Sequence, residues 1–231
     1  MSWLVKTLSS SIGKKFVMGV TGLLLCGFLV AHLAGNLLMY VGADAYNEYA
    51  HALHSQKILL PIAEVSLLAL FAAHIVLAFR TSRENRAARS TSYAVKASKI
   101  DGGSPNSLAR ADTWMLVSGG VVLLFLILHL VDMRLELRPD IDYSNASPFE
   151  RTVRVLRTPL TCLGYLAGSL FLGLHVSHGF ASAFQSLGVN HPKWTPWIQI
   201  IALIFAIVIA LGFASFPVLI PLGNPVLTPM Q

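Results

Sequence analysis

The stretch FVMGVTGLLLCGFLVAHLAGNLLMY spans residues 16–40, and its only side chain that titrates near neutral pH is His32. A bilayer core about 30 Å thick is crossed by roughly 20 apolar residues at about 1.5 Å each, so the stretch is long enough for a membrane-spanning helix. Three lysines precede it, but it is too long for the apolar part of a signal peptide and lacks a convincing cleavage site. We therefore expect it to be retained as the first transmembrane helix.

Four further apolar stretches of similar length follow, at 58–79, 112–133, 158–184 and 196–220. The composition agrees with them: 55% of the residues are hydrophobic, 12% are charged and the mean hydropathy is +0.64, which exceeds what a soluble domain of this size can bury. The stretches are continuous rather than alternating, which favours helices over strands. The sequence therefore predicts an all-α membrane protein, a single transmembrane domain over residues 1–231, with a polar loop at 81–111.

The basic residues predict the direction of insertion. If the N-terminus lies in the cytoplasm, the inner segments hold eleven of the 17 Lys and Arg residues, and the outer segments hold six that are interleaved with acidic residues. The positive-inside rule therefore favours a cytoplasmic N-terminus. The net charge of +6 does not indicate nucleic-acid binding, because the basic residues are confined to the segments between apolar stretches.

Each of the first four apolar spans contains histidine: His32, His74 and His129 in the first three, and His175 with His178 in the fourth. An ionisable side chain in a span suggests function, although a single histidine can simply bond a neighbouring helix. His32 and His129 each lie 17 residues past a charged residue at the inner end of their span, roughly 25 Å deep, whereas His74 and His175 lie nearer the inner surface. Two levels with two histidines each suit two bis-imidazole haems. Zinc favours three or four ligands at one level, and a proton relay needs no pairing.

A short pattern occurs twice before the deeper histidines. Residues 20–33 read VTG, five residues, FL, two residues, HL, and residues 117–130 read VSG, five residues, FL, two residues, HL. The glycine could let a flat macrocycle approach the backbone, or the small residues could pack two helices together. Gly35, Gly173 and Gly179 lie beside histidines in the same manner. His175 and His178 share a helix face, so their spacing does not choose between them.

The chain resembles the di-haem cytochrome b membrane subunit of succinate dehydrogenase and fumarate reductase complexes, in its single-chain, five-helix form. The order and spacing of the matching residues cover nearly the whole chain. They are Gly13-Lys14-Lys15, Thr21-Gly22, His32 to Asn36, Tyr46-Asn47, His51, His74, Ser118-Gly119, His129 and His175 to Gly179.

This resemblance implies two haem b groups with four axial ligands, paired between the first and third spans and between the second and fourth. The ligands are His32 with His129 for the outer haem and His74 with His175 for the inner haem. The family motif has its ligand four residues before Gly179, which selects His175 and leaves His178 as a packing residue. It also implies a haem-bearing four-helix bundle with a peripheral fifth helix.

The resemblance further implies a membrane-anchor and electron-transfer subunit in the bacterial cytoplasmic membrane. A flavoprotein subunit and an iron-sulfur subunit would bind on its inner face and carry out the dicarboxylate chemistry. The present chain would pass electrons between the iron-sulfur subunit and a quinone, expected to be menaquinone. The same residues support succinate oxidation and fumarate reduction, so the sequence does not give the direction.

Candidate residues for the quinone and for the haem propionates follow from their chemistry and their level in the membrane. A quinone needs a polar group near the membrane edge, and the outer candidates are His51, His54 and Glu64. The propionates should reach basic or polar groups at the surfaces: Lys14, Lys15 and Trp114 for the inner haem and Arg134 for the outer one, although such residues also act as interfacial anchors.

Two alternative functions remain. The first keeps the haems and makes the chain a cytochrome b subunit of a hydrogenase or formate dehydrogenase. The second discards haem and makes it a proton channel or transporter with histidine relays. Cys26 and Cys162 lie in apolar stretches without CxxC or CxxCH spacing, so we expect them to be small core residues.

Overall fold

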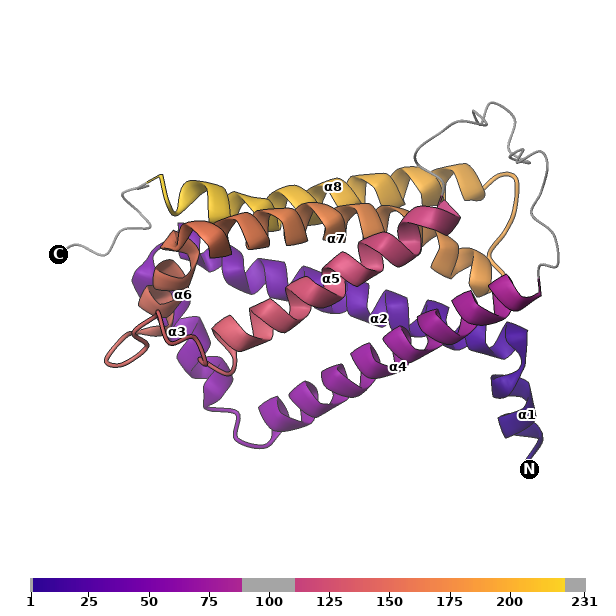
Figure 1. The fold of residues 1–231 in the computed structure, drawn as a ribbon, viewed down its shortest axis with the longest axis horizontal. Helices are drawn as coiled ribbons and strands as arrows, with labels where there is room; N and C mark the ends of the chain where they lie inside the picture. Colours follow the sequence, from indigo (N-terminus) through magenta and orange to yellow (C-terminus); the bar gives the residue numbers. More distant parts are fainter. Residues whose placement is uncertain (1, 89–110, 223–231) are drawn as a thin grey trace.

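Helices form every regular element in the described part of the chain, residues 2–88 and 111–222 of a computed structural model (Figure 1). The elements in chain order are α1 (Trp3–Ser9), α2 (Ser11–Leu37), the 3-10 helix η1 (Leu38–Tyr40), α3 (Ala43–His54), α4 (Leu59–Ala87), α5 (Ala111–Met133), α6 (Pro148–Arg157), α7 (Pro159–Ser186) and α8 (Thr195–Leu219).

Five of these elements are long and apolar enough to cross a membrane, namely α2 with η1, α4, α5, α7 and α8. They coincide with the five stretches predicted from the sequence, so the chain is an all-α multi-pass membrane protein. The two prolines at 159 and 196 lie in the first turns of α7 and α8, where a missing backbone N–H is tolerated. Two helix ends differ from the prediction: α2 begins at Ser11 rather than at residue 16, and α4 continues to Ala87 rather than ending at residue 79.

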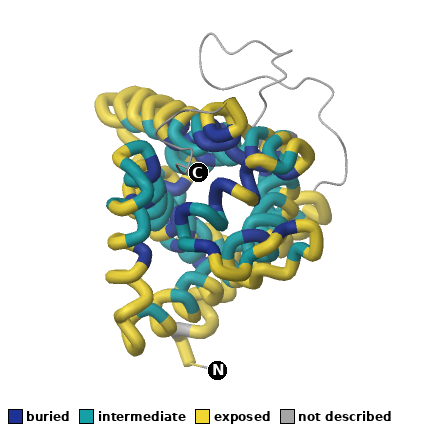
Figure 2. The backbone as a smooth tube through the Cα atoms, turned by 90° about the vertical axis from the view of Figure 1, so that its left-hand side faces the viewer, coloured by how far each residue is buried: buried dark blue, intermediate teal, exposed yellow. Residues whose placement is uncertain are grey.

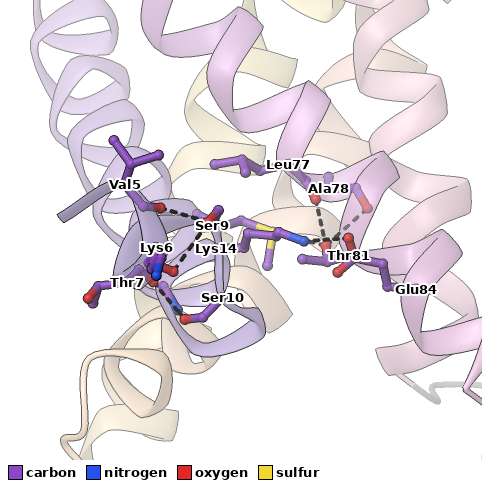
Figure 3. A network of polar contacts seen from close by, with 12 residues as sticks. Val5, Lys6, Thr7, Ser9, Ser10, Lys14, Leu77, Ala78, Thr81 and Glu84 are labelled. Carbon is purple, nitrogen blue, oxygen red and sulfur yellow. Dashed lines mark hydrogen bonds and ion pairs between the residues drawn. The ribbon is translucent and has the colours of Figure 1, made fainter. Parts of the chain in front are cut away.

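Polar contacts at the start of α2 and in the last turns of α4 accompany both extensions (Figure 3). The side chain of Ser10 caps α2 by accepting a hydrogen bond of 3.0 Å from the backbone N–H of Gly13. Lys14 forms an ion pair with Glu84, and the buried Thr81 hydroxyl donates to the carbonyl of Leu77 one turn earlier at 2.6 Å. The prediction of a polar loop from residue 81 is therefore wrong for 81–87, and residues 89–110 of that loop lie outside the described residues.

Four helices form the bundle: α2 packs against α4 and α7, and α5 packs against α7. The fifth, α8, lies along α7 and also touches α2, as expected for a peripheral helix. Glycines allow this close approach. A Cβ atom at Gly173 of α7 would lie 2.5 Å from the Cβ of Ala210, and one at Gly212 of α8 would lie 2.7 Å from Leu33. Figure 2 shows buried residues toward the interior and exposed residues along the outside, where lipid would cover them.

The two ends of the bundle differ. The α1 end holds α1, the last turns of α4 and α7 and the first turns of α2, α5 and α8. The α3–α6 end holds α3 and α6, two short helices in segments between the predicted spans. Ser147 and Glu150 form a capping box at the start of α6, and the backbone N–H of the buried Phe149 donates to Asn47 of α3 at 2.9 Å. These contacts fold the α3–α6 end into a compact cap.

Candidate functional site

The four histidines predicted as ligands meet in two pairs inside the bundle. The ring centroids of His74 on α4 and His175 on α7 lie 6.5 Å apart, with an angle of 81° between the ring planes. Those of His32 on α2 and His129 on α5 lie 5.7 Å apart, with an angle of 80°. These are the two pairs that their depth in the sequence predicted.

The two pairs lie at different levels along the bundle. Thr21 touches His74 of one pair, and His32 of the other pair lies 11 residues later on the same helix. Ser118 touches His175, and His129 again follows 11 residues later. At about 1.5 Å per residue, both helices give a separation of about 16 Å between the pairs. The His74–His175 pair is nearer the α1 end.

A hydroxyl group holds each imidazole of the His74–His175 pair. The Oγ1 atom of Thr21 lies 3.1 Å from Nδ1 of His74, and the Oγ atom of Ser118 lies 3.3 Å from Nδ1 of His175. Each hydroxyl donates its own hydrogen to the backbone carbonyl three residues earlier, so its oxygen accepts from the imidazole Nδ1–H. The proton then resides on Nδ1, and Nε2 presents a lone pair. Metal-binding histidines are commonly held in this way.

Glycines beside these hydroxyl residues make room for the same two rings. A Cβ atom at Gly22 would lie 3.3 Å from Cε1 of His74, and one at Gly119 would lie 3.2 Å from Cε1 of His175. The repeated Thr/Ser-Gly pattern therefore contacts the histidine of the neighbouring helix. In the sequence the pattern precedes the histidine of its own helix, and a linear pattern does not show which helix lies opposite.

The His32–His129 pair is held by an amide, a phenol and aromatic rings. Nδ2 of Asn36 lies 3.5 Å from Nδ1 of His32, and the hydroxyl of Tyr165 lies 3.4 Å from Nδ1 of His129. Phe28 stacks on His32 at a centroid distance of 5.2 Å, and Phe125 lies 5.9 Å from His129. Both distances are longer than a normal hydrogen bond of about 2.7–3.2 Å, so packing contributes more here than in the other pair.

The geometry of both pairs fits one metal ion between two imidazoles. A transition metal lies about 2.0–2.1 Å from a bound imidazole nitrogen, and the ring centre is about 1 Å further, so two coaxial imidazoles have centroids about 6 Å apart. No Nε2 atom of the four histidines forms a hydrogen bond within the described residues. Nor does any group of three or more His, Cys, Asp or Glu side chains gather there to hold a metal ion. Two facing histidines suffice for haem, because the porphyrin supplies the other four ligands.

The candidate propionate contacts lie at the two ends of the bundle. Lys14 is paired with Glu84, and its neighbour Lys15 is exposed. Trp114, in the first turn of the described part of α5, is half-buried. Arg134 forms a two-pronged contact with Glu64, with hydrogen bonds of 2.9 and 3.0 Å.

The quinone candidates lie at the α3–α6 end. His51 and His54 are exposed in the last turn of α3, and Nδ1 of His54 lies 2.8 Å from the carbonyl of Ala50. Glu64, in the second turn of α4, is the partner of Arg134. None of these three side chains lines the nearby open groove of about 380 Å³, which Ser55, Gln56, Lys57, Ile58, Leu59 and Ile62 form.

A further polar cluster, which the sequence analysis did not identify, lies between α5 and α7 at the α3–α6 end. Asp132 is completely buried, and Arg138 donates from Nη1 to its Oδ1 atom at 3.3 Å and to Thr161 at 2.6 Å. Arg138 also donates to Asp140, which lowers the pKa of the Asp140 carboxyl below its usual value. Tyr165 adjoins both Asp132 and His129. An aspartate in the last turn of an apolar span was the signal for this cluster.

The remaining candidates make few polar contacts. His178 is half-buried on α7 and forms no hydrogen bond within the described part of the chain. Cys26 and Cys162 are free thiols, and Sγ of Cys162 donates to the carbonyl of Pro217 at 2.7 Å.

Comparison with models of protein families, with curated proteins and with solved structures gives no match for this chain.

Proposed function

We propose that this chain is the di-haem cytochrome b membrane subunit of a succinate:quinone or quinol:fumarate oxidoreductase. The observation that supports this proposal best is that four histidines form two pairs. In each pair the two histidines come from different helices, and their ring centroids lie 6.5 and 5.7 Å apart. Their separation along the bundle, about 16 Å, suits two haems stacked across a membrane. Each bound haem would supply a site that accepts and releases one electron.

The chain's own residues fix the position and the surroundings of the two haems. Thr21 and Ser118 keep the protons of His74 and His175 on Nδ1, so that Nε2 is available to iron. Phe28 and Phe125 exclude water around the other pair.

The proposed location is the bacterial cytoplasmic membrane with the α1 end inside. Eleven of the 17 Lys and Arg residues belong to segments at this end, although four of them lie at 89–110, outside the described residues. At the α3–α6 end, four arginines are instead paired with acidic side chains: Arg134, Arg138, Arg151 and Arg154. The flavoprotein and iron-sulfur subunits would bind at the α1 end, next to the His74–His175 pair.

The electron acceptor or donor in the membrane would be a quinone, with menaquinone as the expected species. His51, His54 and Glu64 remain candidates for its binding because all three lie at the α3–α6 end, near the His32–His129 pair. Lys14, Lys15, Trp114 and Arg134 remain candidates for the propionates. The chain itself would not act on dicarboxylates.

A reduced-minus-oxidised absorption spectrum of the purified chain tests the proposal. We expect b-type haem bands, two haems per chain, and loss of about one haem in each of the variants His32→Ala and His74→Ala. His191→Ala, which removes an exposed histidine between α7 and α8, is the matched control and should keep both haems. A chain without b-type absorption would refute the proposal and favour a proton channel or transporter. Co-purification with a flavoprotein and an iron-sulfur protein separates it from a hydrogenase or formate dehydrogenase subunit.

A further inference from the structure

A groove opens between α5 and α7 at the α3–α6 end. It has a volume of about 670 Å³, and its lining residues are Leu128, Arg138, Leu160, Thr161, Leu163 and Gly164. The side chains of Leu160 and Leu163 are exposed on a membrane-spanning helix, so lipid would border the groove there. The walls are therefore apolar, and the polar groups Arg138 and Thr161 lie together in one part of the lining.

Two hydrogen-bond donors in this polar part have no acceptor within the described residues. Arg138 has five N–H groups, and four of them donate hydrogen bonds to Asp132, Asp140 and Thr161. The Oγ1 atom of Thr161 accepts from Arg138, and its own hydrogen has no acceptor within the described residues. One guanidinium N–H and one hydroxyl are thus available to an oxygen atom of a ligand.

An acceptor lies behind them. Asp132 is completely buried, and its Oδ2 atom has no hydrogen-bond partner within the described residues. The hydroxyl of Tyr143, close to Asp132, is likewise buried without a partner there. Buried polar atoms are rarely left unpaired, so these two atoms leave hydrogen-bonding capacity unused beside the groove.

The charges in the cluster select a neutral ligand. The single positive charge of Arg138 is already paired with the carboxylates of Asp132 and Asp140, so it offers little attraction to an anionic head group such as a lipid phosphate. A neutral carbonyl or hydroxyl needs only the free donors.

The groove also lies beside the His32–His129 pair. Leu128 directly precedes His129 on α5, and Tyr165, one turn after Thr161 on α7, has its hydroxyl 3.4 Å from Nδ1 of His129. A head group at Arg138 and Thr161 would therefore lie about one helical turn from the pair.

We propose that the α5–α7 groove binds the quinone, with a head-group oxygen at Arg138 and Thr161 and the apolar tail along Leu160 and Leu163. The proposal rests on the proposed function, and it places the ligand away from the α3 and α4 candidates His51, His54 and Glu64.

Calorimetric titration of a short-tailed naphthoquinone into the purified full-length chain in micelles tests this site. Thr161→Val removes one donor, and with it the acceptor of one Arg138 N–H, at nearly constant volume, and we expect about threefold to tenfold weaker binding. Leu163→Trp should fill the groove and weaken binding at least tenfold. Leu203→Trp, at an exposed position on α8, is the matched control and should bind as the natural chain does.

The same preparations separate this proposal from the proposed function, because haem content is read from the absorption spectrum. Full haem content with weakened naphthoquinone binding in Thr161→Val and Leu163→Trp supports the groove. Unchanged binding in both variants overturns it, as does loss of binding in Glu64→Gln alone. Dihexanoyl phosphatidylglycerol should not bind in the groove, so Leu163→Trp should not change its titration. If Leu163→Trp abolishes phosphatidylglycerol binding and leaves naphthoquinone binding unchanged, the groove is a lipid site and the proposal is overturned.

Discussion

Removing the hydroxyl of Thr21 should weaken haem binding at one histidine pair and spare the other. Thr21→Val keeps the shape of the side chain but takes away the oxygen that lies 3.1 Å from Nδ1 of His74. A buried donor without a partner costs about 1–3 kcal/mol, which corresponds to about fivefold to 150-fold in affinity. Loss of a group that holds a metal-binding histidine typically weakens the metal site about tenfold to 100-fold, in agreement with this range.

The assay is the haem content of purified chains, followed by redox titration of the absorption bands. We expect Thr21→Val to retain about one haem per chain after extensive washing, with a changed midpoint potential if the second haem stays bound. Thr21→Ser should restore the natural behaviour because it restores the hydroxyl. Thr81→Val is the matched control, since its hydroxyl donates to the backbone of its own helix and does not touch a histidine.

Two results would refute this reasoning. The first is full haem content and an unchanged potential in Thr21→Val. The second is equal damage in Thr21→Ser and Thr21→Val, because the hydroxyl would then not be the group that matters.

Three further predictions concern packing, a helix cap and pH. Gly119→Ala places a Cβ atom 3.2 Å from His175 and should weaken haem binding about fivefold or more, whereas Gly120→Ala, with no heavy atom within 4 Å of the new Cβ, should leave the spectrum unchanged. Ser147→Ala removes the cap of α6 and should lower the free energy of unfolding by about 1 kcal/mol, measured by chemical denaturation in micelles; no change would mean that the cap is redundant. The pKa of Asp140 is lowered in the folded chain by Arg138, so its stabilising effect is present above the unfolded pKa, near 3.9, and is lost as the pH falls through the folded pKa. Asp140→Asn should therefore flatten the acid side of the stability curve, and an unchanged curve would contradict the role of this ion pair.

The repeated pattern before His32 and His129 has a structural meaning that links both pairs. In each of the helices α2 and α5, a Thr or Ser and a glycine contact one ligand of the His74–His175 pair, and the helix itself carries one ligand of the other pair. Each of these helices thus serves two sites about 16 Å apart. A substitution at Thr21 or Ser118 should therefore affect the His74–His175 pair, whereas a substitution 11 residues later on the same helix should affect the His32–His129 pair.

Much of this arrangement could be predicted from the sequence because it depends on one-dimensional distances. The length of the apolar stretches determines the five spans, since each must cross a bilayer of fixed thickness. The position of a histidine within its span determines its depth, since a helix rises by a constant amount per residue. The two levels, and hence the pairing of His32 with His129 and of His74 with His175, follow from these two facts.

Contacts between helices could not be predicted in this way, because the sequence gives depth but not rotation or neighbour. That Thr21 and Gly22 face His74 depends on α2 packing against α4, and that Ser118 and Gly119 face His175 depends on α5 packing against α7. The cluster around Asp132 likewise requires the turn after α5 to bring Arg138 back onto α7. The sequence alone therefore determined which residues lie at which depth, and only the tertiary structure decided which side chains hold them there.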